Sequence, residues 1–151
     1  MTSMRVEVDQ SGKMEVLRVD TALALSNGIT ASILIPAAVK REVYRQLKYR
    51  GVKHNMIVAR MFAAGLFLLL RDYLGSITTV IIDVEYEGWD AIIRGLLLAR
   101  IRKVSPCIHK DQIGFGYVGK KSPAHKVALE VFRKKHAPGK KINARGLLSL
   151  C

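Results

Sequence analysis

Three short apolar segments, separated by tight turns, open the chain before any helical pattern begins. Met4–Asp9 alternates apolar and charged residues with the period of two that is typical of a half-buried strand. A second segment begins at Met14, and the turn at Asn27-Gly28 leads to a third, Ile29–Ile35. Consecutive strands joined by short turns pair with one another, so this order predicts a three-stranded antiparallel meander.

After the meander, helical and strand patterns alternate. Helices are expected over Pro36–Gly51, Asn55–Leu74, Trp89–Lys103 and Ser122–His136, and strands over Ile77–Asp83 and Gln112–Val118. The predicted fold is therefore α/β, with a mixed five-stranded sheet in which two parallel strands join the meander and helices cover both faces. The 151 residues suffice for one domain, 1–151, and the segment at about 137–151 is predicted to be a basic tail.

The second predicted helix is apolar almost all round. A helix of this kind is either central in its domain or part of an oligomer interface, so a homodimer through helix 55–74 is one expectation. Its longest hydrophobic run, Met61–Leu70, is too short to cross a bilayer and lies between Arg60 and Arg71. No membrane partner is expected.

Charge is distributed unevenly along the chain, whose formal net charge is +13. Residues 1–90 carry 11 basic and 10 acidic side chains, whereas residues 91–151 carry 14 basic and 2 acidic ones. Such a basic excess predicts a polyanionic partner, either nucleic acid or an anionic surface, although solvated lysines would give the same count. The candidate nucleic-acid-binding residues are Lys120, Lys121, Lys126, Arg133, Lys134 and Lys135, with Lys140, Lys141 and Arg145 beyond them and Tyr117 or Tyr86 as contacts to sugar or base.

The two cysteines, Cys107 and Cys151, form neither a disulfide framework nor a metal-binding spacing. The first ten residues contain no apolar signal-peptide region. Together these features predict a cytoplasmic protein.

Acidic residues end two strands that are expected to be neighbours. Asp9 closes the first predicted strand and Asp83 the fourth, which can join the meander only on the free side of strand one. Two adjacent carboxylates repel unless a proton or cation lies between them, and hard divalent metals prefer oxygen ligands. Glu85 lies on the same strand face as Asp83 by the period of two. The alternative is that Asp9 is a turn residue and Asp83 a strand-end cap.

Three stretches, VEVDQSGK, TTVIIDVEYEG and GFGYVGKKSPAHKVALEV, follow the same order of elements as one known superfamily. The chain resembles the ribonuclease H-like superfamily of retroviral integrases and Holliday-junction resolvases over about residues 4–136. The resemblance implies two Mg²⁺ or Mn²⁺ ions held by Asp9 and Asp83, and in-line attack of water on a phosphodiester.

The resemblance also implies a third acid and a fourth site residue. The third is Glu42, on the first predicted helix, or Glu85, and the alternative for Glu42 is an ion pair with Arg45. At the fourth position the family commonly has Asp, and here only His125 fits, as a neutral metal ligand or proton relay at a helix N-terminus. The alternative for His125 is a core histidine packed over Leu129 and Phe132.

The function expected from these features is a Mg²⁺- or Mn²⁺-dependent nuclease that cuts RNA/DNA hybrid, structured RNA or branched DNA. A catalytically inactive nucleic-acid-binding protein on the same fold is the main alternative. A third interpretation is an assembly protein that dimerises through helix 55–74.

Overall fold

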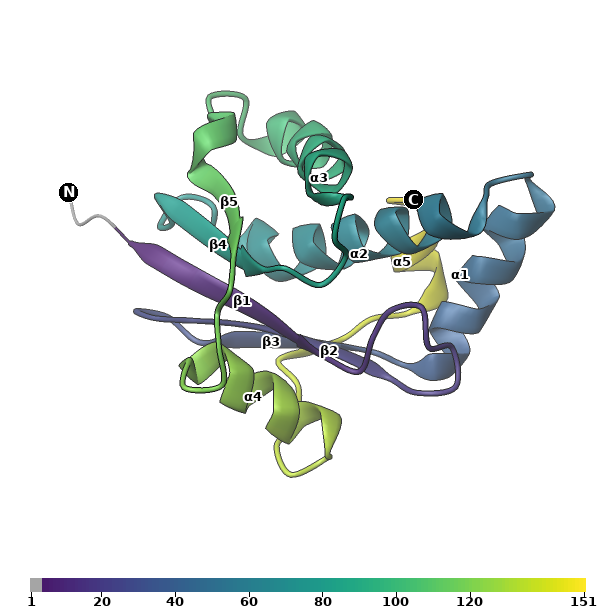
Figure 1. The fold of residues 1–151 in the computed structure, drawn as a ribbon, viewed down its shortest axis with the longest axis horizontal. Coiled ribbons are helices and arrows are strands. Elements are labelled where there is room, and N and C mark those ends of the chain that lie inside the picture. Colours follow the sequence, from purple (N-terminus) through teal and green to yellow (C-terminus); the bar gives the residue numbers. More distant parts are fainter. Residues whose placement is uncertain (1–3) are drawn as a thin grey trace.

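The computed structural model describes residues 4–151 and arranges them around a six-stranded sheet (Figure 1). The sheet has the strand order β5-β4-β1-β2-β3-β6. Its strands are β1 (Arg5–Ser11), β2 (Thr21–Ser26), β3 (Ala31–Ile35), β4 (Thr79–Asp83), β5 (Ile113–Gly116) and β6 (Lys140–Lys141). The helices are α1 (Ala37–Tyr49), α2 (His54–Leu70), α3 (Asp90–Val104), α4 (Pro123–Phe132) and α5 (Ala144–Leu148), with 3₁₀ turns η1 (Arg71–Tyr73) and η2 (Lys110–Gln112).

Strand β1 lies near the centre of the sheet. It pairs antiparallel with β2 and parallel with β4, while β2 pairs antiparallel with β3 and β4 pairs parallel with β5. This arrangement confirms the mixed sheet, with an antiparallel meander and two parallel strands on the free side of β1. Since parallel strands end at the same edge, the carboxyl ends of β1 and β4 lie side by side.

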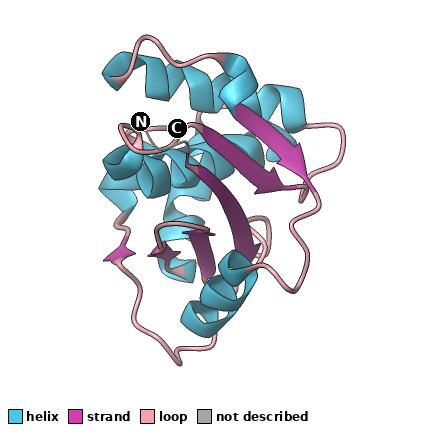
Figure 2. Cartoon of the chain, turned by 90° about the vertical axis from the view of Figure 1, so that its left-hand side faces the viewer, coloured by secondary structure: helices cyan, strands magenta, loops and turns pink. Residues whose placement is uncertain are grey.

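Helices cover both faces of the sheet, as the two perpendicular views show (Figures 1 and 2). Helix α4 packs on β1 and β2 from one side, and α2 packs on β2 and β3 from the other. Helix α2 also contacts α1, α3 and α5. Every residue of Met61–Leu70 is buried within the chain, so a central position accounts for the apolar composition of this helix. The homodimer through helix 55–74 stays a prediction. No helix in residues 4–151 is long and apolar enough to span a membrane.

The second strand begins at Thr21, so the prediction that it starts at Met14 was wrong. The preceding segment forms turns instead, with the amide of Val16 donating to the carbonyl of Lys13 at 3.0 Å. The Lys40 ammonium, from the first turns of α1, donates to the carbonyls of Lys13 and Val16 and to the Thr21 hydroxyl. This buried cation supplies the donors that the loop would otherwise obtain from a neighbouring strand.

The segment after residue 137 is folded, so the prediction of a basic tail and of only five strands was wrong. Strand β6 pairs parallel with β3, and α5 packs against α1 and α2. Ile142 and Leu147 are 8% and 0% exposed, respectively, and both belong to the hydrophobic core. The segment is rich in Lys and Arg, and its short apolar pattern, which includes Ile142 and Leu147, did not indicate that it packs on the core.

Helix α4 begins where the sequence predicts and ends earlier. The Ser122 hydroxyl accepts a hydrogen bond from the amide of Ala124 at 3.3 Å, and Pro123 occupies the first turn. The helix ends at Phe132 rather than His136, and Lys134 adopts a positive φ of 61° just beyond it. The cations after Phe132 therefore lie in a loop.

Candidate functional site

A cavity of about 270 Å³ lies where β1 and β4 end and α4 begins. Its walls come from both halves of the chain, because the β5–α4 loop and α4 meet the two central strands there. The residues that line the cavity are Asp9, Gln10, Asp83, Glu85, Tyr117, Gly119, Lys120 and His125.

Three carboxylates gather in this cavity. One oxygen from each of Asp9, Asp83 and Glu85 lies within 4.8 Å of the other two. The parallel register of Val8 with Ile82 places Asp9 beside Asp83, because both residues continue their strands by one position. Glu85 follows Asp83 by two residues along the chain. Within residues 4–151, this cluster is the only group of three or more His, Cys, Asp or Glu side chains placed to hold one metal ion.

The cluster is electrostatically unfavourable without a cation. Burial, the hydrogen bond to Asp83 and the charges of Asp83 and Asp9 together raise the pKa of Glu85 to about 8, and burial is the largest of these causes. Burial likewise raises the pKa of Asp9, which is 5% exposed, although the Gln10 amide and His125 oppose this increase. Lys13, which sequence reasoning missed, lowers the pKa of Glu85 by its charge.

Asp9 has hydrogen-bond donors at both carboxylate oxygens. The Gln10 amide donates to Oδ1 at 2.8 Å, and His125 Nδ1 lies 2.7 Å from Oδ2. An ionised carboxylate accepts hydrogen bonds only, so with Asp9 ionised the proton of this contact lies on Nδ1 of His125. His125 therefore orients Asp9, which is a more specific contact than the packing over Leu129 and Phe132 that was the alternative.

A second hydrogen bond between side chains joins the beginning of α4 to β1, next to the contact between His125 and Asp9. The Ser122 hydroxyl donates to Oε1 of Glu7 at 3.1 Å. Glu7 and Asp9 share one face of β1 by the period of two, and Ser122 and His125 are three residues apart on one side of α4. Sequence reasoning used Ser122 only as a helix cap, because the spacings assign each residue to a face of its own element and do not identify its partner on the other element.

Asp83 is held by the loop that follows β5. The backbone amide of Val118 donates to its Oδ1 at 2.8 Å. The hydrogen bond fixes the carboxylate and also fastens the loop that carries Tyr117, Gly119 and Lys120 to the end of β4. The predicted role of Asp83 as a strand-end cap and its place in the acidic cluster therefore coexist.

The two tyrosines proposed as nucleic-acid contacts have different environments. The Tyr86 hydroxyl accepts from the Met14 amide at 3.1 Å and is 3.3 Å from the Gln10 side chain, and its ring packs edge-on against Phe62. Tyr86 is thus part of the support beneath Gln10 rather than a surface contact. Tyr117 is 85% exposed.

The six predicted nucleic-acid-binding cations extend from the cavity along α4 to its far end. Lys120 lines it, and Lys121 and Lys126 are exposed on the adjoining loop and on α4. Three further cations are exposed beyond the carboxyl end of α4, at Arg133, Lys134 and Lys135. All six are accessible to a polyanion.

Glu42 does not reach the cluster. It lies on α1, where its carboxylate forms an ion pair with Arg45 at 2.8 Å and accepts from the Gln46 amide at 2.9 Å. These contacts lower the pKa of Glu42. The ion pair with Arg45, which was the alternative to a metal role, is the arrangement found, and Glu85 is the third carboxylate of the site.

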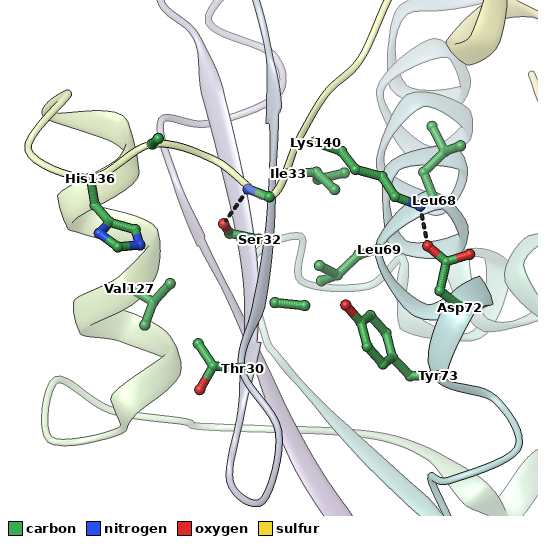
Figure 3. A pocket seen from close by; sticks show the side chains of 13 residues that line it. Thr30, Ser32, Ile33, Leu68, Leu69, Asp72, Tyr73, Val127, His136 and Lys140 are labelled. Carbon is green, nitrogen blue, oxygen red and sulfur yellow. Dashed lines mark hydrogen bonds and ion pairs between the residues drawn. The ribbon is translucent and has the colours of Figure 1, made fainter.

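A second hollow, of about 230 Å³, lies between α2, β3 and the segment after α4 (Figure 3). Its one carboxylate, Asp72, pairs with Lys140, and the Gly139 amide donates to the Ser32 hydroxyl at 3.0 Å. Because Asp72 and Lys140 are already paired with each other, this hollow does not contain a cluster of catalytic side chains.

Comparisons with protein-family models, curated proteins and solved structures find no match to this chain.

Proposed function

We propose that the chain is a divalent-metal-dependent nuclease of ribonuclease H-like architecture, acting on phosphodiester bonds with Mg²⁺ or Mn²⁺. One observation carries the proposal: Asp9, Asp83 and Glu85 bring carboxylate oxygens within 4.8 Å of one another near the carboxyl ends of two parallel central strands. A cluster this close requires either a shared proton or a bound cation. The pKa of Glu85 is raised to about 8, in part because the neighbouring carboxylates of Asp83 and Asp9 disfavour a further negative charge.

The donor set fits a hard divalent ion. All three groups are carboxylates, which Mg²⁺ and Mn²⁺ prefer, and the cavity holds neither a thiol nor a second histidine that would favour a softer metal. Asp9, Asp83 and Glu85 would hold the ion. When bound, such an ion supplies water activation and charge stabilisation for phosphodiester hydrolysis.

The residues around the cluster supply orientation and charge. His125 holds the Asp9 carboxylate through Nδ1, and when the ring is neutral its Nε2 is available to accept a proton. The Val118 amide holds Asp83, and Lys120 places a cation on the cavity wall for a phosphate. The RNA/DNA hybrid, structured RNA and branched DNA expected from the sequence all present such a phosphate.

Cleavage by wild type and by the Asp9→Asn, Asp83→Asn double variant, titrated with Mn²⁺, tests the proposal. The wild type should cut in proportion to site occupancy, and the double variant should lose at least about a thousandfold in rate, as expected when charge-stabilising groups are removed. Asp111→Asn, at an exposed carboxylate on η2, is the matched control and should cut like wild type. Equal cleavage by wild type and the double variant would exclude this site.

The second candidate is a non-catalytic nucleic-acid-binding protein on the same fold. It is favoured by His125, which occupies the place of a fourth carboxylate and hydrogen bonds to Asp9. This function predicts no cleavage with any metal, and binding whose logarithm falls with log salt by about 0.7 to 0.9 per phosphate contacted. Replacement His125→Asp separates the candidates, because a fourth carboxylate raises cleavage only in a true metal site.

A further inference from the structure

Tyr117 is an exposed aromatic residue on the wall of the acidic cavity. Its side chain is 85% exposed, and it lines the cavity together with Gly119 and Lys120. Three other large hydrophobic residues in residues 4–151 are exposed, Tyr49 at 92%, Val104 at 62% and Ile92 at 40%, and none of them lines that cavity. An open aromatic face therefore stands directly beside the carboxylates of the proposed nuclease.

The backbone on both sides of Tyr117 is fixed to the end of β4. The carbonyl of Gly116 accepts from the Val84 amide at 3.1 Å, and the Val118 amide donates to Asp83 Oδ1 at 2.8 Å. The backbone of Tyr117 is thus held at a defined position relative to Asp83. Its ring is 85% exposed, so packing in the core does not account for an aromatic residue here. Binding a ligand through Tyr117 therefore costs little additional conformational entropy, because its backbone is already held in place.

Cations continue from the same loop. Lys120 lines the cavity, and Lys121 and Lys126 are exposed where α4 begins. The cavity itself, at about 270 Å³, lies below the range of about 300 to 1,000 Å³ typical of pockets that enclose a small molecule. A polymer that crosses the cavity, with its phosphates near the lysines and one base over Tyr117, fits this layout better than an enclosed ligand.

We propose that Tyr117 stacks on an unpaired base beside the phosphate that occupies the acidic cavity, and that the substrate is therefore nucleic acid with a single-stranded nucleotide at this position. The inference rests on the proposed nuclease function, whose substrate class it narrows. In the interior of a duplex each base is covered on both faces by its neighbours, so a protein ring stacks on a base there only at the cost of unstacking it, whereas an unpaired nucleotide leaves a base face open. Aromatic stacking of this kind tolerates any sequence.

Equilibrium binding without divalent metal tests the inference, with a fluorescently labelled single-stranded oligonucleotide and a blunt duplex of the same sequence, each as DNA and as RNA. Wild type should prefer at least one single strand. Tyr117→Ala should bind that strand about tenfold more weakly and the duplex unchanged, and Tyr117→Phe should bind like wild type. Tyr49→Ala, at an exposed tyrosine of α1, is the matched control and should have no effect.

Salt dependence separates stacking from charge. Tyr117→Ala should leave the slope of log affinity against log salt unchanged, because no phosphate contact is removed. Lys120→Gln should reduce the slope by about 0.7 for a single strand, the value expected for one phosphate contact. A slope that changes with Tyr117→Ala would show that the variant disturbs the loop and would overturn the assignment of stacking.

The outcomes distinguish this inference from the proposed function. Cleavage that requires Asp9 and Asp83, together with binding that is indifferent to Tyr117, would overturn the stacking proposal and leave the nuclease. Tyr117-dependent binding of a single strand without cleavage at any Mn²⁺ concentration would support the base contact and overturn the nuclease. A preference for duplex in wild type, or equal losses on both probes, would overturn the stacking proposal.

Discussion

Replacement of Lys40 by methionine should destabilise the protein and loosen the loop beside the candidate site. Lys40 is 0% exposed, and its ammonium donates to the carbonyls of Lys13 and Val16 at 3.1 and 2.7 Å and to the Thr21 hydroxyl at 3.0 Å. Methionine fills a similar volume without any donor. Each buried acceptor that loses its partner costs about 1 to 3 kcal/mol, and the loop recovers part of this by opening to water, so we expect a net loss of about 2 to 3 kcal/mol at pH 7.

The same lysine should make stability depend on pH. Burial lowers the pKa of Lys40 from 10.5 to about 8, against the opposing charges of Glu15 and Asp20. Between these two pH values the unfolded chain keeps the Lys40 proton and the folded chain releases it, so the free energy of unfolding rises with pH. At about 1.4 kcal/mol per pH unit, wild type should gain up to about 3 kcal/mol relative to the methionine variant between pH 8 and 10.5.

Urea unfolding followed by circular dichroism at pH 7, 8.5 and 10 measures both effects. Lys48→Met, at an exposed lysine on the same helix, is the control and should lie within about 0.5 kcal/mol of wild type at every pH. The difference between wild type and Lys40→Met removes the titration of other groups. Equal stability at pH 7 would refute the role of Lys40 in holding the loop, and a pH-independent difference would refute its desolvation.

Three further predictions concern the site and the carboxyl-terminal segment. Mn²⁺ should raise the melting temperature of wild type by several degrees and that of Glu85→Gln much less, and equal shifts in a thermal scan would place the ion elsewhere. His125→Ala should weaken Mn²⁺ binding by about 10- to 100-fold in calorimetry, since it removes the group that orients Asp9, whereas an unchanged affinity would restrict His125 to a structural role. Leu147→Ala should cost about 2 to 4 kcal/mol in urea unfolding, because the side chain is 0% exposed, while Arg145→Ala, at an exposed residue, should cost almost nothing.

Local periodicity explains which parts of the fold were predictable. Val6 and Val8 alternate with charged residues, which correctly indicated a strand with one core face, although the strand continues two residues past its predicted end at Asp9, to Ser11. The free side of β1 then determined that β4 would join in parallel and bring Asp83 beside Asp9. Both inferences use only neighbours in sequence and the rules of strand order.

The missed features depend on partners distant in sequence. Ser122 meets Glu7 across 115 positions, and the Tyr86 hydroxyl meets the Gln10 side chain across 76. Lys40 is buried because the loop at 13–16 turns its carbonyls toward it, which no property of α1 reveals. A pattern can assign a side chain to a face, but it does not identify which polar group on another element will satisfy it.

Helix α4 joins the two differently charged parts of the chain at the site. Along β1, Glu7 and Asp9 are about 6.6 Å apart, and along α4, Ser122 and His125 are about 4.5 Å apart, so the two hydrogen-bonded pairs hold the helix at one register and one inclination to the strand. A shift of α4 by one residue would turn His125 by about 100° and remove its bond to Asp9. The register that orients Asp9 also places Lys120 on the cavity wall and Lys126 on the adjoining helix. The near-neutral first part of the chain thus provides the acids, the basic last part provides the cations, and these two pairs set the distance between them.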